Sequence, residues 1–243
     1  MNVRCRHLTV WAAAVLIGFV VPAAAQVAPA GPPGLAAERF PRPIRPVASI
    51  VSDQWQTEDA RERVGEARLV MDLLGIRAGM AVADIGAGSG YYTVRLAARV
   101  GADGRVLAQD VVPQYLEALQ RRIGREGLGN VAVSMGEAGD PRLPPGSVDV
   151  ALLVHMYHEI EQPFALLHNL LPSLRPGARV AVLDANRPTL QHGTPPDLLR
   201  CELVAVGYRE VAFHALENGA EYLAVFAPPE RGPAPETIRP CRW

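Results

Sequence analysis

The sequence contains no lysine, and all 24 of its basic residues are arginines. A chain without lysine cannot form a Schiff base with a carbonyl substrate, and it cannot build the lysine-containing loop of P-loop nucleotidases. The formal net charge is only -1, and the arginines form no basic run. Because proteins bind nucleic acids through clustered positive charge, this composition argues against a nucleic-acid partner.

Cysteine is also scarce, with three residues in the chain. Cys5 lies in the N-terminal segment, so the rest of the chain holds only Cys201 and Cys241. Two thiols could pair in an oxidising compartment, but the sequence does not give the distance between them. We therefore leave open whether this disulfide forms.

The first 25 residues have the features of an export signal. Arg4 and Arg6 precede an apolar stretch over residues 8–21, and Ala23 and Ala25 match the small-x-small pattern of a cleavage site. The apolar stretch is shorter than the roughly 20 residues of a membrane-spanning helix. We expect cleavage after Ala25, a periplasmic or secreted protein and no stable membrane span afterwards. An uncleaved membrane anchor is the alternative.

Proline-rich segments bracket the part of the chain that we expect to fold. Residues 26–47 are rich in Pro and Ala and predict a linker or an arm along the surface, and residues 228–243 form a Pro-rich tail. With 49% hydrophobic residues, the chain can bury one full core. We place the folded domain at residues 48–227.

Apolar runs of strand length alternate with helical patterns inside this domain, which predicts an α/β fold. Strands are expected over 80–85, 104–110, 131–133, 148–154 and 179–184. Helices are expected over 57–75, 93–100, 113–123, 164–174 and 197–206. Pro172 deletes a helical hydrogen bond, so we expect a kink or an early helix end there. Two further strand-like runs, 208–216 and 220–227, flank Asn218-Gly219, which is typical of a hairpin turn.

The most informative segment is Gly86-Ala87-Gly88-Ser89-Gly90, which follows an apolar strand and precedes a helix. Glycines at this spacing allow a tight turn and let a ligand lie against the bare backbone at the positive end of a helix. The loop is shorter than the Gly-x-Gly-x-x-Gly of dinucleotide folds. The carboxylate of Asp84, two residues before it, would repel a pyrophosphate and attract an ammonium group.

The motif Val82-Ala83-Asp84-Ile85 followed by this glycine loop resembles the first motif of class I S-adenosylmethionine-dependent methyltransferases. The resemblance covers about residues 55 to 227. It implies a Rossmann-like methyltransferase fold, with a mostly parallel seven-stranded sheet, helices on both faces and a C-terminal antiparallel hairpin. It also implies S-adenosylmethionine as the cofactor, with Asp84, Gly86, Ala87, Gly88 and Gly90 at its methionine half.

Acidic residues after the next two strands extend the resemblance. Asp110 ends the second strand, where a carboxylate can accept hydrogen bonds from both hydroxyls of a ribose, although it could also cap the helix that follows. Glu137 follows the third strand, where the family commonly places an acid near the adenine amine. Asp140 competes with Glu137 for that role, and either could belong to a plain acidic turn.

The segment after the fourth strand holds His155, Tyr157, His158 and Glu159. The resemblance places it at the methionine side of the cofactor and at the mouth of the acceptor pocket. His155 would contact the cofactor, while Tyr157 and His158 would orient or deprotonate the acceptor. The alternative is a set of polar residues that covers the pocket without transferring a proton.

His155, His158, Glu159 and Glu161 lie close enough in sequence for metal ligation to be weighed. We expect no metal, because the chain has neither His-Glu-x-x-His nor Cys-x-x-Cys spacing. His192 and His214 are interpreted as surface or strand-filling residues. Trp55 resembles a residue of a segment that folds over the cofactor in related proteins.

The leading functional interpretation is methyl transfer to a small-molecule acceptor. Because the cofactor is made in the cytosol, an exported protein would meet little of it, and a non-catalytic protein that binds a nucleoside-like ligand is the first alternative. A nicotinamide-dependent oxidoreductase is a weaker one, disfavoured by loop spacing and by Asp84. The acceptor and the oligomeric state are not readable from the sequence.

Overall fold

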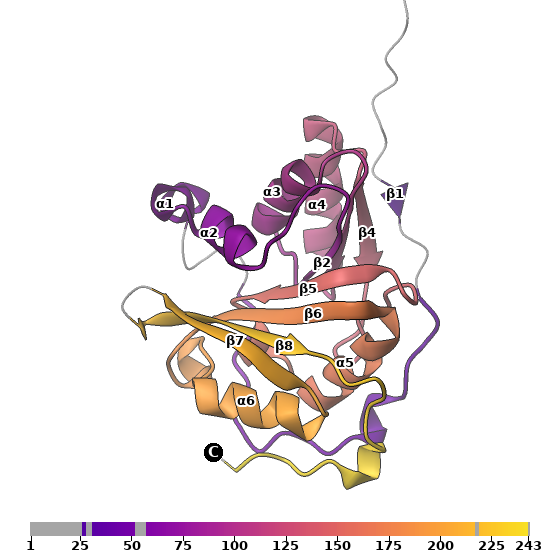
Figure 1. The fold of residues 1–243 in the computed structure, drawn as a ribbon, viewed down its shortest axis with the longest axis vertical. Helices are drawn as coiled ribbons and strands as arrows, with labels where there is room; N and C mark the ends of the chain where they lie inside the picture. Colours follow the sequence, from indigo (N-terminus) through magenta and orange to yellow (C-terminus); the bar gives the residue numbers. More distant parts are fainter. Residues whose placement is uncertain (1–25, 28–30, 52–56, 217–218, 243) are drawn as a thin grey trace, which may run out of the picture.

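A computed structural model of the protein describes residues 26–27, 31–51, 57–216 and 219–242 (Figure 1). The predicted export signal, Trp55 and Asn218 lie outside the described residues. Among the residues that are described, no helix combines the length and the apolar character needed to cross a lipid bilayer.

One mostly parallel sheet forms the centre of the molecule. Its strands lie in the order β1-β4-β3-β2-β5-β6-β8-β7, and the last two pairings, β6 with β8 and β8 with β7, are antiparallel. The strands are β1 (Gln26–Val27), β2 (Ala81–Ile85), β3 (Arg105–Asp110), β4 (Val131–Met135), β5 (Val148–Val154), β6 (Leu174–Ala185), β7 (Arg209–Leu216) and β8 (Glu221–Ala227). The expected sheet with its C-terminal antiparallel strands is confirmed, and β1 adds a short edge strand that the sequence did not predict.

Helices cover both faces of this sheet, and two hydrophobic clusters fill the layers between (Figure 1). The helices are α1 (Glu58–Val64), α2 (Glu66–Leu73), α3 (Tyr91–Val100), α4 (Pro113–Glu126), α5 (Pro163–Leu170) and α6 (Pro196–Ala205). Helices α2, α3 and α4 pack on one face, and α5 and α6 on the other. Because both faces are covered, central strands such as β5 are apolar on both sides.

Two helical predictions are refined by the structure. The helix expected over residues 57–75 is two helices, since Gly65 adopts a left-handed conformation (φ 65°) that ends α1 and starts α2. The helix expected over 164–174 ends early, as Pro172 predicted: α5 stops at Leu170 and a 3-10 turn, Leu171–Ser173, follows. The strand that comes next is longer than expected and begins at Leu174.

Residues 31–51 form an arm that packs against the domain, so the structure favours the arm over a free linker. Phe40 is buried in the cluster beneath α5. The arm is held by hydrogen bonds to distant segments, with Gly34 N–H donating to Asp140 Oδ2 (2.8 Å) and Leu35 N–H to Asn169 Oδ1 (2.9 Å). Through Phe40 the hydrophobic core extends to the N-terminal side of residue 48, where the sequence had placed the start of the folded domain.

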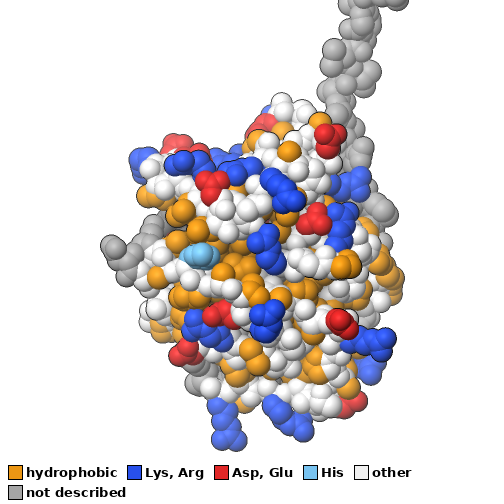
Figure 2. All heavy atoms as spheres, in the orientation of Figure 1, with side chains coloured by type: hydrophobic (Ala, Val, Ile, Leu, Met, Phe, Trp, Pro, Cys, Tyr) orange, Lys and Arg blue, Asp and Glu red, His pale blue; other side chains and the backbone are white. Residues whose placement is uncertain are grey.

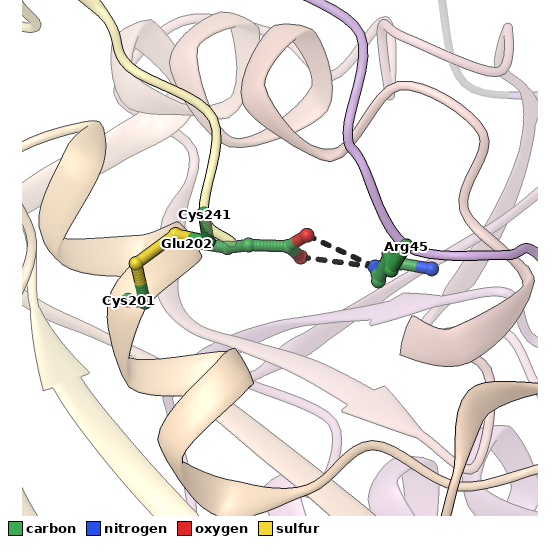
Figure 3. The surroundings of a disulfide bond; sticks show 4 residues. All are labelled: Arg45, Cys201, Glu202 and Cys241. Atoms are coloured by element: carbon green, nitrogen blue, oxygen red, sulfur yellow. Dashed lines mark hydrogen bonds and ion pairs between the residues drawn. A yellow bond between two sulfur atoms is a disulfide. The ribbon is translucent and has the colours of Figure 1, made fainter. Parts of the chain in front are cut away.

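The deepest contact of the arm is a buried ion pair between Arg45 and Glu202 of α6 (Figure 3). Arg45 Nε lies 3.0 and 3.2 Å from the two carboxylate oxygens, and both side chains are 1% exposed. The rest of the guanidinium donates to the backbone carbonyls of Tyr157 (3.2 Å), His158 (3.4 Å) and Ile160 (3.2 Å). Arg45 therefore joins the arm, α6 and the loop after β5.

A disulfide between Cys201 and Cys241 lies beside this ion pair (Figure 3). It ties the C-terminal tail to α6, and the Cα atoms are 6.0 Å apart. The tail also contributes Ile238 to the core. The pairing that the sequence left open is therefore formed in the structure.

Charged side chains of both signs are interspersed on the face drawn in Figure 2, with apolar side chains between them. Around α1 this mixing is an ion-pair network: Glu58 pairs with Arg95 and Arg122, and Glu62 pairs with Arg95. The arginines of this region are therefore neutralised locally.

The disulfide makes a testable contribution to stability. Its cysteines are 40 residues apart in sequence, and closing a loop of that length stabilises a protein by about 4 kcal/mol in the chain-entropy account. We expect Cys241→Ser to lower the free energy of unfolding by roughly 2–4 kcal/mol in urea titrations. Cys201→Ser should lower it by the same amount, and the double variant by no more than either single variant. A Cys241→Ser midpoint equal to that of the wild type would contradict the contribution.

Candidate functional site

A cavity of about 370 Å³ opens at the carboxyl ends of β2 and β5. These two strands are neighbours, but the strands that follow them lie on opposite sides of the pair: β3 lies beside β2, and β6 lies beside β5. Open α/β sheets bind ligands where the strand order reverses in this way. The cavity is lined by the glycine loop, the loop after β5, and residues of the arm, α1 and α3.

The glycine loop forms the floor of the cavity, and two of its glycines are required by sterics. Gly86 has φ 71°, and a Cβ there would meet the Met156 side chain at 2.9 Å. Gly90 has φ 88°, and a Cβ there would meet Leu119 at 2.4 Å. Gly86, Ala87 and Gly88 line the cavity, whereas Gly90 does not. Gly90 therefore shapes the turn into α3 rather than contacting a ligand.

Asp84 lies at the base of this loop and lines the cavity. It is 2% exposed, and its Oδ2 accepts a hydrogen bond from the Thr93 hydroxyl at 2.6 Å. Burial raises the pKa of Asp84 to about 6, Asp110 adds to the rise, and the Thr93 bond partly offsets it. A carboxylate held this way favours a cationic ligand group, which would neutralise it.

Asp110 closes the opposite side of the loop at the end of β3. Its carboxylate accepts bonds from the backbone N–H groups of Gly88 (2.9 Å), Val111 (2.7 Å) and Val112 (3.0 Å). Burial raises its pKa, against the effect of these bonds. Asp110 does not cap the following helix, since the N-cap of α4 is Val112 and has no side-chain hydrogen bond. It lines the cavity, which leaves the ribose role open to it as a prediction.

Neither acidic candidate after β4 reaches the cavity. The Glu137 side chain is 72% exposed and lies 3.6 Å from Arg142. Asp140 is buried, but its oxygens accept from Gly34 N–H and Arg142 N–H, which fixes the arm. The structure thus contradicts the placement of Glu137 at the adenine, because the turn after β4 directs its side chain to solvent. Ala138 is the residue of this turn that lines the cavity.

His155 lines the cavity, as predicted for a cofactor contact. Its backbone is left-handed (φ 51°), and its N–H donates to the Leu183 carbonyl at 2.8 Å. Its Nε2 lies 4.0 Å from Glu66 Oε2 and 4.0 Å from Glu221 Oε1. Burial lowers the pKa of His155, so the neutral imidazole is favoured.

His158 also lines the cavity, from the short 3-10 turn η2 (Tyr157–Glu159). Its Nδ1 is 3.1 Å from each carboxylate oxygen of Asp184, at the end of β6. Asp184 is fixed by further bonds from the Thr194 hydroxyl (2.7 Å) and the Ala185 N–H (2.8 Å). Because an ionised carboxylate only accepts, the neutral imidazole carries its hydrogen on Nδ1 and keeps a lone pair on Nε2.

Tyr157 is the clearest wrong prediction. It is fully buried and does not line the cavity. The Arg45 guanidinium carbon lies over the Tyr157 ring, 5.5 Å from the ring centroid. Burial and the nearby Glu202 carboxylate hold the pKa of Tyr157 well above its usual range. Consecutive residues of a 3-10 turn point in different directions, so His158 faces the cavity while Tyr157 enters the core.

Several cavity residues were not identified from the sequence. His192 follows the 3-10 turn η4 (Thr189–Gln191) and is partly exposed, and it lines the cavity, a position that the sequence did not predict. Asp184 does not line the cavity but lies behind His158, and it could have been found, since it stands near the end of a central strand as Asp84 and Asp110 do. Arm residues Ile50 and Val51 line the cavity, and Val51 N–H donates to Glu159 Oε1 at 3.1 Å.

Comparisons with known proteins agree with this geometry. A family model described as a methyltransferase domain matches residues 82–177. The chain is 30% identical over 122 residues to a ubiquinone/menaquinone biosynthesis C-methyltransferase of Idiomarina loihiensis, covering 50% of this chain and 49% of that one. It is 37% identical over 84 residues to nocamycin O-methyltransferase of Saccharothrix syringae, covering 35% and 30%. The chain thus spans half or less of the length of these relatives.

Among solved structures, a SAM-dependent methyltransferase from Aquifex aeolicus is similar at a TM-score of 0.64 and 24% identity. The similarity covers 68% of this chain and 91% of that one. Residues 82–177, which the family model matches, contain the glycine loop, Asp84, Asp110 and the loop after β5. Residues 82–177 therefore match a methyltransferase domain, and the chain has the fold of class I S-adenosylmethionine-dependent methyltransferases, which implies S-adenosylmethionine as the cofactor.

Proposed function

We propose that the protein transfers a methyl group from S-adenosylmethionine to a small-molecule acceptor whose attacking atom carries a removable proton. The observation that carries this proposal is that His158, held by Asp184, opens on the same cavity as the glycine loop. The matched relatives are named as a C- and an O-methyltransferase. The imidazole favours a hydroxyl or similar acceptor, because it can accept the proton that such a group loses.

The residues at the glycine loop fit the cofactor. Gly86 presents bare backbone to the cavity, since a Cβ there would meet the Met156 side chain at 2.9 Å, and Asp84 places a buried carboxylate at the base of the loop. Asp84 would hold the ammonium group, and Asp110 the ribose. When bound, S-adenosylmethionine supplies an electrophilic methyl group on a positively charged sulfur.

The acceptor would be prepared by His158. Its Nε2 lone pair takes the acceptor's proton, and the resulting imidazolium is stabilised by the Asp184 carboxylate. The cofactor would supply its methyl carbon to the deprotonated acceptor atom and would keep the electron pair of the carbon–sulfur bond on sulfur. Alignment of the two reactants in one cavity provides the rest of the rate enhancement.

We also propose that the protein works outside the cytosol. The export features of the first 25 residues support this, as does the pairing of Cys201 with Cys241, since disulfides persist in oxidising compartments. Fractionation of cells that express the chain, with N-terminal sequencing, should give a periplasmic or secreted protein that begins at Gln26. A cytosolic protein that retains Met1 would contradict this proposal.

Cofactor binding should depend on the charge of Asp84. Because its pKa is about 6, the carboxyl is neutral below that pH and attracts an ammonium group less, so affinity should fall as the pH drops through about 6. Asp84→Asn should weaken binding at neutral pH by about tenfold or more, as expected for a lost charged hydrogen bond. Calorimetric titration with S-adenosylmethionine from pH 5 to 8 measures both effects.

The control for this titration is Glu137→Gln, which removes an exposed carboxylate outside the cavity. The control should bind like the wild type across the pH range, whereas Asp84→Asn should lose the dependence near pH 6. Undiminished affinity in Asp84→Asn would remove the central claim about this site.

Proton transfer should depend on His158 and on its orientation by Asp184. We expect His158→Gln to lower kcat by about 10²- to 10⁴-fold, the usual contribution of a general base, with the cofactor affinity retained. Asp184→Asn can donate to Nδ1 and so move the hydrogen to Nε2, which should lower kcat and change its pH profile. Release of S-adenosylhomocysteine with a panel of phenols and thiols provides the assay.

Tyr157→Phe is the control for these variants, because Tyr157 neighbours His158 but lies in the core. It should retain the wild-type kcat. A Tyr157→Phe variant as slow as His158→Gln would contradict the assignment of proton transfer to His158.

A further inference from the structure

Three metal-binding side chains converge on one wall of the cavity, from two segments far apart in sequence. His158 and Glu159 come from η2, and His192 follows η4, which packs against η2. One ligand atom from each lies within 4.8 Å of the others, and His158 Nε2 is 4.0 Å from Glu159 Oε1. The rings of His158 and His192 meet edge to face, with centroids 5.5 Å apart.

These distances suit a small divalent cation. Zinc binds imidazole nitrogen and carboxylate oxygen at about 2.0–2.2 Å, so two ligand atoms in a tetrahedral site lie about 3.3 Å apart. The three side chains reach that spacing with shifts of about 1 Å, which rotation about their side-chain bonds provides. Two imidazoles with one carboxylate is also the ligand set of catalytic zinc sites, which keep a fourth position open.

The surroundings of His158 match a metal ligand as well. Histidines that bind a metal through one nitrogen almost always donate the other N–H to a carboxylate or carbonyl. His158 Nδ1 faces Asp184 at 3.1 Å, and Asp184 is itself fixed by Thr194 and by the Ala185 N–H. This leaves Nε2 directed toward Glu159 and His192.

The arm also holds the turn that carries two of the ligands. Glu159 Oε1 accepts the Val51 N–H, and Arg45 and the Ala48 N–H (3.1 Å) both donate to the His158 carbonyl. Burial raises the pKa of Glu159, so a bound cation would offset the cost of ionising it. The turn that carries two of the ligands is thereby fixed in place before any ion binds.

We propose that His158, Glu159 and His192 form a binding site for a zinc-class divalent cation, with an open position that faces the cavity. Imidazole ligands select transition metals over magnesium and calcium, which prefer oxygen.

A second cluster, Glu66 with His155 and Glu221, is a weaker candidate. Glu66 already accepts bonds from Arg61 Nε (3.1 Å) and from the Tyr92 hydroxyl (2.9 Å). The Arg61 guanidinium neutralises that carboxylate, and its positive charge opposes a cation there. Replacing a histidine should therefore weaken zinc binding only if that histidine belongs to the cluster that holds the ion.

This inference rests on the proposed function, because the ion can have a role in methyl transfer only if the protein transfers methyl groups. An acceptor hydroxyl or thiol that binds at the open position loses its proton to water, because a cation lowers the pKa of a bound ligand. In the ion-free protein His158 Nε2 accepts the acceptor's proton itself, as under the proposed function; with the ion bound, the same nitrogen holds the ion and the proton leaves to water. The acceptors would then be small molecules whose attacking oxygen or sulfur can coordinate zinc.

The test uses the untagged full chain, stripped with EDTA and titrated with zinc chloride by calorimetry. Elemental analysis after dialysis gives the stoichiometry, and the visible spectrum of the cobalt(II)-substituted protein reports imidazole and carboxylate coordination. We expect one ion per chain. Affinity should fall at least about tenfold in His192→Ala and Glu159→Gln, and by about ten- to a hundredfold in Asp184→Asn, as for other outer partners of metal ligands.

His214→Ala and His155→Ala are the matched controls, since His214 lies outside the cavity and His155 belongs to the second cluster. Both should keep the wild-type zinc affinity. Absence of stoichiometric binding, or unchanged affinity in His192→Ala, would overturn the site. Loss of binding in His155→Ala would move the ion to the second cluster and also overturn the assignment.

Binding of S-adenosylmethionine to the stripped protein separates this proposal from the proposed function. We expect the stripped protein to bind the cofactor, because the glycine loop and Asp84 are outside the ion site. Full methyl transfer by the stripped protein would overturn the ion's role and leave the proposed function intact. Zinc binding without any cofactor binding would support the ion site and contradict the methyltransferase activity.

Discussion

The buried ion pair between Arg45 and Glu202 is the contact on which the site depends. Two charges at 1% exposure lose their hydration, and such a pair is tolerated only when every donor and acceptor is satisfied. Here the remaining guanidinium nitrogens bond to three carbonyls of the loop after β5. Removing one charge would leave the other buried and unpaired, at a cost of about 3–5 kcal/mol. The arm, α6 and the cavity wall are therefore energetically one unit.

The cavity itself follows from the sheet. The chain leaves the neighbouring parallel strands β2 and β5 toward opposite sides of the sheet, which opens a crevice between their two loops, and these loops carry different chemistry. The loop after β2 is bare backbone with a buried carboxylate, and the loop after β5 carries imidazoles and a glutamate. Ile50 and Val51 of the arm complete the wall. One side of the cavity thus suits a cofactor and the other an acceptor.

Local patterns predicted the sheet and the glycine loop well, because strand periodicity and turn glycines act over a few residues. Asp84 was found from its place two residues before the glycine loop, and Asp110 from its place at the end of the next strand. Tyr157 and Glu137 were misplaced because the direction of a side chain in a turn is set by tertiary packing. His192 could not be placed from the sequence, since only the fold brings η4 to η2. The packing of the Pro-rich arm was equally hidden, because one buried arginine in it decides where the arm lies.

Arg45 recognises carbonyl oxygens, which every residue type offers. Arg45 therefore holds the backbone of residues 157–160 whichever side chains these positions carry. Substitutions at cavity-facing positions of this turn can change what the cavity accepts while the turn keeps its shape. In evolution or in engineering, such an arrangement separates the selection of a new acceptor from the maintenance of the fold.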